Sequence, residues 1–210
     1  MSHSQEHQTV GQLVAERPSR SRVFEQYGID YCCGGKKPLD QACRDRNVSL
    51  AELVAALGAA DESPGADDVN WGQRTMGELV DHIISTHHVY LRHELPRLEY
   101  LIGRVVKAHG ARRSALQQVA LIFAALKAEL ESHMLKEERI LFPMIRQLES
   151  CDELPSFHCG SLDAPISIME HEHDSAGRAL EQLRLLTGNY SPPDDACNTY
   201  RAMLSGLAEL

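Results

Sequence analysis

Two polar side chains, His133 and Glu137, lie four residues apart within the run SHMLKEE at residues 132–138. Residues with this spacing stand one above the other on the same face of an α-helix. A buried carboxylate is costly unless it is paired or bound to a metal. The pattern therefore predicts a helix that presents an imidazole and a carboxylate to a metal ion. The rest of that face is apolar, with hydrophobic residues in steps of three and four: Val119, Phe123, Leu126, Leu130, Leu141, Met144 and Leu148.

Two further helical segments place a histidine within an apolar stripe. His88 continues the stripe between Ile84 and Leu91, and His173 does so in a later segment. His87 borders the same face, so the spacing favours His88 without excluding its neighbour. Any one of these is more often a core histidine than a ligand. Three histidines on consecutive helices, together with one glutamate, favour a shared site for iron, manganese or zinc. Mixed His/Glu sites in the cores of helical bundles commonly hold two irons.

Three other glutamates lie near these positions in the sequence. Glu138 follows Glu137 by one position, so we expect it to turn toward solvent. Glu129 and Glu172 flank the predicted site. Two interpretations stay open for them, the lining of an access path and two solvated helix charges, and the second is favoured.

An adjacent cysteine pair, Cys32 and Cys33, follows a glycine-rich turn and precedes two lysines. A glycine turn entering a helix exposes sulfur and lowers the pKa of a thiol, which favours a reactive thiolate. Two ordinary cysteines at a helix start explain the pair equally well. The six cysteines of the chain are scattered and do not form a disulfide framework, so we expect reduced thiols in the cytoplasm.

The elements that must position these residues are helical. Hydrophobic residues recur with a period of 3.6 almost throughout, whereas alternation at period two is rare, and this predicts an all-α chain. A polar break at 58–73 separates a small helical domain, residues 1–60, from a linker at 61–74 and a four-helix bundle at 75–210. The bundle helices are expected from Thr75 to about Ala108, from Ser114 to Leu148, from about Asp163 to Gly188, and after Pro193 to Leu210.

Composition excludes several classes of function. The 210 residues carry a net charge of −9 and no basic stripe with aromatic residues, so we expect no nucleic-acid partner. No apolar run approaches the ~20 residues of a membrane span, so no membrane association is expected. The first thirty residues lack the apolar core of a signal peptide, which does not support export.

Four motifs in this chain resemble those of a known family. They are DYCCGGK at 30–36, DHII at 81–84, SHMLKEE at 132–138 with LFP at 141–143, and MEHEHD at 169–174. The chain is similar over nearly its whole length to the repair-of-iron-centres (RIC) proteins, also called regulators of cell morphogenesis and nitric oxide signalling. The resemblance implies a hemerythrin-like up-down-up-down bundle behind a small Cys-Cys domain.

The resemblance also implies a site and a function. It assigns a non-haem di-iron centre to His88, His133, Glu137 and His173, and a catalytic redox or transfer role to the N-terminal cysteine pair. It implies a cytoplasmic stress protein that repairs iron-sulfur clusters by supplying iron, by binding or reducing nitric oxide, or by both. The implied partners are iron-sulfur proteins and nitric oxide or another small diatomic molecule. Whether the chain is an enzyme of nitric oxide reductase type, and whether it forms a homodimer, is left open.

Two other classes of function stay open. One is a hemerythrin-like sensor that binds oxygen, nitric oxide or iron without turnover. The other is a regulatory protein whose N-terminal domain recruits a partner while a metal only stabilises the bundle.

One departure from the family pattern lies at the end of the chain. Family members continue the fourth helix to a further His-x-x-x-Glu pair, whereas this sequence stops at Glu209-Leu210. We therefore expect a truncated chain that lacks two ligands. Such a site holds one metal, holds two with partial occupancy, or borrows ligands from a second chain.

Overall fold

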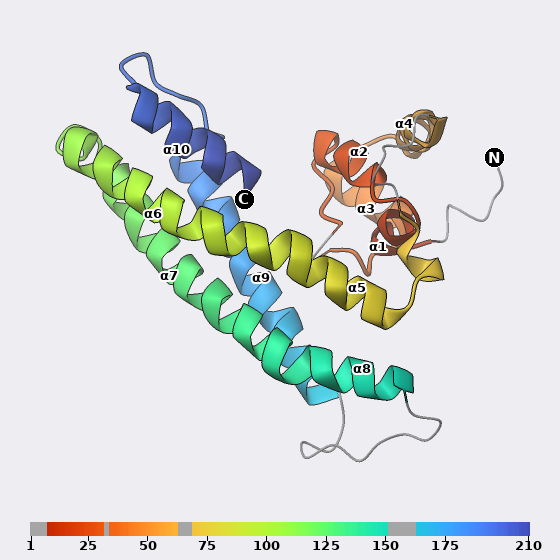
Figure 1. Ribbon diagram of the computed structural model, residues 1–210. Coiled ribbons are helices and arrows are strands. Elements are labelled where there is room, and N and C mark those ends of the chain that lie inside the picture. The colour runs from red at the N-terminus through yellow and green to blue at the C-terminus, as the bar shows by residue number, and fades with distance from the viewer. Residues whose placement is uncertain (1–7, 32–33, 63–68, 151–162) are drawn as a thin grey trace. The chain divides into compact units, whose positions relative to one another are not determined.

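The fold is known from a computed structural model, which describes residues 8–31, 34–62, 69–150 and 163–210 (Figure 1). Throughout these ranges the regular elements are helices, and the β-type pairing found there is an isolated bridge between Thr9 and Pro38. The predicted all-α class is thereby confirmed. The chain divides into two compact units, Met1–Thr75 and Met76–Leu210. The predicted linker at 61–74 lies partly outside the described residues.

The first unit packs four short helices around one apolar core. A capping box between Thr9 and Gln12 begins the first helix, where each side chain bonds the backbone N–H of the other residue. The buried guanidinium of Arg20 donates to both carboxylate oxygens of Asp61, which ties the second helix to the fourth. The helices are α1 (Val10–Glu16), α2 (Arg20–Gln26), α3 (Leu39–Arg46) and α4 (Leu50–Glu62), followed by the 3-10 turn η1 (Trp71–Gln73).

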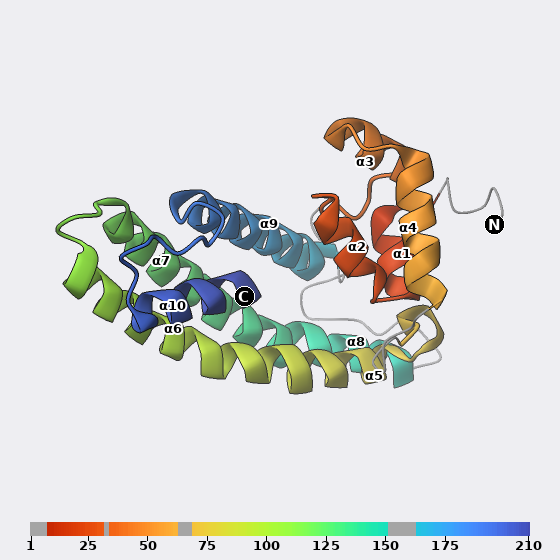
Figure 2. The same ribbon diagram turned by 90° about the horizontal axis from the view of Figure 1, so that it is seen from above.

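The second unit is the predicted four-helix bundle. The helix formed by α5, η2 and α6 lies beside the helix formed by α7, η3 and α8, α9 packs on α7, and α10 packs on α6 (Figures 1 and 2). Both composite helices contain a π-helical segment. The elements are α5 (Met76–His82), η2 (Ile83–His88), α6 (Val89–His109), α7 (Ala115–Lys136), η3 (Glu137–Leu141), α8 (Phe142–Ser150), α9 (Asp163–Leu186) and α10 (Asn198–Glu209).

The bundle core follows the apolar stripes of the sequence. Burial of these side chains, rather than helix propensity, supplies most of the stability of such helices. A smaller cluster of Val80, Leu141, Phe142 and Met169 closes the end of the bundle formed by α5 and α8. Within the described ranges, no helix combines the length and apolar character needed to cross a bilayer. The main core includes Leu95, Leu98, Ile102, Val105, Val119, Phe123, Leu126, Leu183, Met203 and Leu204.

Candidate metal centre

In both composite helices a predicted ligand lies at one end of the π-helical segment. Segment η2 ends on His88, and segment η3 begins with Glu137. The N–H of Phe142 donates to the carbonyl of Glu137, five residues earlier, instead of four as in an α-helix. The extra residue in the turn rotates the following side chains, and such turns are frequent at functional sites. Pro143 favours this geometry, because its ring clashes with the carbonyl four residues earlier in a regular α-helix.

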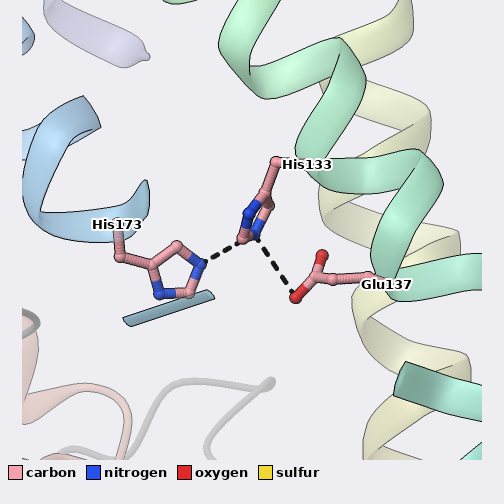
Figure 3. Close-up of side chains that lie close together, drawn as sticks. All are labelled: His133, Glu137 and His173. Atoms are coloured by element: carbon pink, nitrogen blue, oxygen red, sulfur yellow. Dashed lines mark hydrogen bonds and ion pairs between the residues drawn. The ribbon is translucent and has the colours of Figure 1, made fainter. Parts of the chain in front are cut away.

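Three of the four predicted ligands form a compact group. Nε2 of His133 lies 3.0 Å from Nε2 of His173 and 3.5 Å from Oε1 of Glu137. Figure 3 shows the three side chains pointing toward one another. One ligand atom from each lies within 4.8 Å of the others, which is close enough for a shared ion. His133 and Glu137 are buried, as their stripe predicted, whereas His173 is exposed.

The fourth predicted ligand, His88, joins this group through the carboxylate. Its Nε2 lies 3.0 Å from Oε2 of Glu137, so each oxygen of Glu137 faces a different imidazole. His88 is 3% exposed, and its ring stacks on Phe142 with centroids 5.7 Å apart. The neighbouring His87 is exposed and meets the ring of His82 instead. The structure therefore distinguishes between the two adjacent histidines that spacing left open.

The expectation that Glu138 faces solvent is wrong. Its Oε1 lies 2.7 Å from Nδ1 of His88, and Nη2 of Arg92 donates to both of its oxygens at 2.6 and 2.7 Å. The expectation placed Glu138 on the solvent side because it is one position past Glu137, whereas this side of the helix faces His88 and Arg92 of the neighbouring helix.

The favoured interpretation of Glu172 as a solvated charge is also wrong. Its Oε2 lies 2.9 Å from Nδ1 of His133, and its other oxygen pairs with Lys136. Glu129 differs, because its contact is a hydrogen bond from Ser175 on the exposed surface. Two of the three central imidazoles thus have an outer carboxylate that is itself paired with a cation.

The sequence contained a local signal for these outer groups. Arg92 lies one helical turn after His88, and Lys136 and Glu138 flank Glu137. Residues one turn apart share a helix face, so the sequence could indicate a cation near His88, from Arg92, and near His133, from Lys136 three residues later.

Charges within the group lower the pKa of its central carboxylate. Burial raises the pKa of Glu137, but hydrogen bonds and charge from His133 and His88 outweigh burial and bring it below its usual value. Burial lowers the pKa of His133, whereas Glu137 and Glu172 raise it, and the net result is an increase. Burial and the neighbouring His133 lower the pKa of His173. The lowered pKa values favour an ionised Glu137 and a neutral His173, which are the forms that bind metals, whereas the raised pKa of His133 favours a protonated ring that would release its proton on metal binding.

The predicted catalytic pair, Cys32 and Cys33, lies outside the described residues. The residues on either side are held in place. The N–H of Gly34 donates to the Asp30 carboxylate at 3.0 Å, and the N–H of Gly11 donates to the carbonyl of Gly35 at 2.8 Å.

Comparison with known proteins agrees with this arrangement. A family model described as the hemerythrin HHE cation binding domain matches residues 79–210, which include all four predicted ligands. The iron-sulfur cluster repair protein YtfE of Enterobacter sp. (strain 638) is 39% identical over 203 residues, covering 97% of this chain and 87% of that protein. The chain belongs to the YtfE family.

Other members of the YtfE family are also similar to this chain over nearly its whole length. The YtfE proteins of Edwardsiella ictaluri (strain 93-146) and Escherichia coli O8 (strain IAI1) are 38% and 37% identical to it. They cover 96% and 97% of this chain, and the match spans 86% and 87% of their own lengths. A second model, described as a domain of unknown function (DUF542), matches residues 6–61 and spans the Cys32-Cys33 pair. The resemblance to the repair-of-iron-centres proteins is therefore confirmed.

Proposed function

We propose that this YtfE-family chain holds a pair of non-haem irons and repairs iron-sulfur clusters damaged by nitrosative or oxidative stress. Its relatives are named as iron-sulfur cluster repair proteins, which supports this function over that of a hemerythrin-like sensor. The partners in the proposal are iron-sulfur proteins and nitric oxide, and the compartment is the cytoplasm. The match to a cation-binding domain and the cluster of His133, Glu137 and His173 support the proposal that the chain binds a metal.

The observation that carries the proposal is the position of Glu137 between two imidazoles. One carboxylate oxygen lies 3.0 Å from Nε2 of His88, and the other lies 3.5 Å from Nε2 of His133. Glu137 would hold the metal together with His88 on one side and with His133 and His173 on the other, a mixed His/Glu set of the kind found in di-iron bundles. The donors are imidazole and carboxylate without thiolate, a set that suits iron.

The residues of this chain have separable tasks in the proposed activity. Glu137, His88, His133 and His173 would hold the metal, and all of these except His173 are buried in the bundle. Iron, when bound, supplies a site for nitric oxide and is also the cargo that a damaged cluster needs. The N-terminal cysteine pair is proposed to serve redox or transfer steps.

Anaerobic titration with ferrous iron tests the proposal. We expect the intact chain to retain up to two irons and to restore activity to an iron-sulfur protein previously treated with nitric oxide. Glu137→Ala should lose iron and repair, because it removes the carboxylate shared by two imidazoles. Glu131→Ala is the control, since Glu131 lies on the same helix but pairs with Lys127 at the surface, 3.8 Å away.

Two results would contradict the proposal. One is an intact chain that retains no iron and whose spectrum does not respond to nitric oxide. The other is a chain that binds oxygen reversibly and restores no cluster, which would favour the sensor instead.

A further inference from the structure

Arg92, Glu138 and His88 form a row in which Glu138 of η3 contacts two residues of the composite helix formed by α5, η2 and α6. Nη2 of Arg92 donates to both oxygens of Glu138, and Oε1 of Glu138 lies 2.7 Å from Nδ1 of His88. On the other side of the ring, Nε2 faces Glu137 at 3.0 Å. The imidazole therefore has an outer carboxylate on one nitrogen and the proposed metal-binding carboxylate on the other.

The outer carboxylate determines which ring nitrogen is available to a metal. A neutral imidazole carries one proton, and the hydrogen bond made by one nitrogen decides which nitrogen holds it. With Glu138 as acceptor, a neutral ring would keep its proton on Nδ1 and would offer the lone pair of Nε2 to a metal ion bound beside Glu137. A carboxylate in this position also fixes the orientation of the ring and makes the ligand nitrogen more basic.

Arg92 makes this arrangement compatible with a buried site. Glu137 already brings a negative charge into the cluster, and a second carboxylate nearby would add unfavourable repulsion. The guanidinium of Arg92 offsets the charge of Glu138 and holds both of its oxygens, so the acceptor has one orientation. Hydrogen bonds between charged partners are about twice as strong as neutral ones.

We propose that Glu138, held by Arg92, is the positioning residue that fixes the tautomer and orientation of His88 for metal binding. This inference rests on the proposed function, because it assigns His88 to the metal. Glu138 acts through His88 and is not itself a ligand in this proposal. The sequence around Glu138 does not assign it a positioning role, and the comparisons with known proteins do not either.

Zinc alone is a suitable probe, because it accepts imidazole and carboxylate ligands and gives sharp NMR spectra. In the zinc-loaded full chain we expect a slowly exchanging Nδ1–H proton signal from His88. Glu138→Ala should remove that signal and raise the dissociation constant for zinc about 10- to 100-fold. Glu138→Gln keeps an oxygen acceptor without the charge, so it should recover part of both properties.

Two matched variants separate positioning from cross-linking. Glu99→Ala breaks the Lys127–Glu99 pair, 2.7 Å long, which also links the two long helices but touches no imidazole. It should leave zinc affinity and the Nδ1–H signal unchanged. Arg92→Ala removes the guanidinium but keeps the acceptor, so the signal should persist and the dissociation constant should rise less than in Glu138→Ala.

Each contrary result has a distinct meaning. Wild-type affinity in a folded Glu138→Ala protein would overturn the positioning role while leaving the proposed function intact. An equal loss of affinity in Arg92→Ala and Glu138→Ala, with the Nδ1–H signal retained in both, would show that the cross-link matters and not the acceptor. Failure of the wild-type chain to bind either zinc or iron would overturn the proposed function and this inference with it.

Discussion

The thiol of Cys197 lies 3.4 Å from Nε2 of His109, immediately before α10. The hydrogen bond from His109 and contacts with backbone N–H groups of that helix hold the pKa of Cys197 below its usual value. Cys43 is the opposite case, because its burial raises the pKa of its thiol. Since the thiolate is the nucleophile, the two cysteines should differ strongly in reactivity.

Alkylation with iodoacetamide, followed peptide by peptide with mass spectrometry, measures that difference. A lowered pKa means that the thiolate appears at lower pH, so the pH–rate profile of Cys197 should begin to rise below that of an ordinary thiol. Cys43 should label only after unfolding. His109→Gln should move the Cys197 profile to higher pH, and an unchanged profile would show that His109 does not activate the thiol.

At the scale of elements, the contact between α10 and α6 depends on a glycine. A Cβ at Gly206 would lie 2.7 Å from Cδ2 of Leu98 and 2.9 Å from Oε1 of Glu94, and both distances are shorter than normal contacts allow. By contrast, a Cβ at Gly103, also helical but exposed, would meet nothing within 4 Å. The two glycines therefore form a matched pair for testing the packing of the fourth helix.

The two alanine substitutions should have opposite effects on the free energy of unfolding. Gly206→Ala should lower it by about 1–3 kcal/mol through overpacking. Gly103→Ala should raise it by about 0.5–1 kcal/mol, because alanine loses less backbone entropy in a helix. Urea unfolding measures both, and stabilisation by Gly206→Ala would mean that the side chains of Leu98 and Glu94 move aside at little cost.

The π segments are the feature of the helices that periodicity did not predict. The ends expected for both long helices agree well with those observed. The apolar pattern indicates which helix face is buried on average over several turns. One extra residue in a single turn changes this average too little to be detected. Pro143 was the available signal at η3, since proline is poorly accommodated inside an α-helix.

At the scale of the whole molecule, the two compact units have separate apolar cores. The first unit buries Leu13, Phe24, Leu39 and Leu53, whereas the proposed metal ligands all lie in the second. A ligand that binds only a folded unit stabilises that unit by mass action. Ferrous iron should therefore slow amide hydrogen exchange in the helices of residues 76–210. Amide exchange in residues 8–62 should change little.

Hydrogen exchange with mass spectrometry measures this under anaerobic conditions, with Glu137→Ala as the control that should show no response to iron. Equal protection of both units would contradict separate stabilisation. Protection that persists in Glu137→Ala would place the iron elsewhere.

The amino-acid sequence by itself determined the helical class, the approximate ends of the bundle helices, and the placement of His133 and Glu137 on one buried face. These features are local, because they depend on periodicity and on residues one turn apart. The sequence predicted that His88 and His173 join the same cluster only because each lies within the apolar stripe of its own helix, and such stripes meet in a bundle core. The domain limits and the roles of Cys32 and Cys33 stay predictions.

Only the tertiary structure decided which groups meet across helices. His88 meets Glu138, His133 meets Glu172, and His109 meets Cys197 over separations of 50, 39 and 88 residues. Such pairs depend on how far each helix is rotated about its axis and shifted along it. Packing of the whole core sets both quantities, and a π turn changes the rotation by one residue, so no local pattern encodes them.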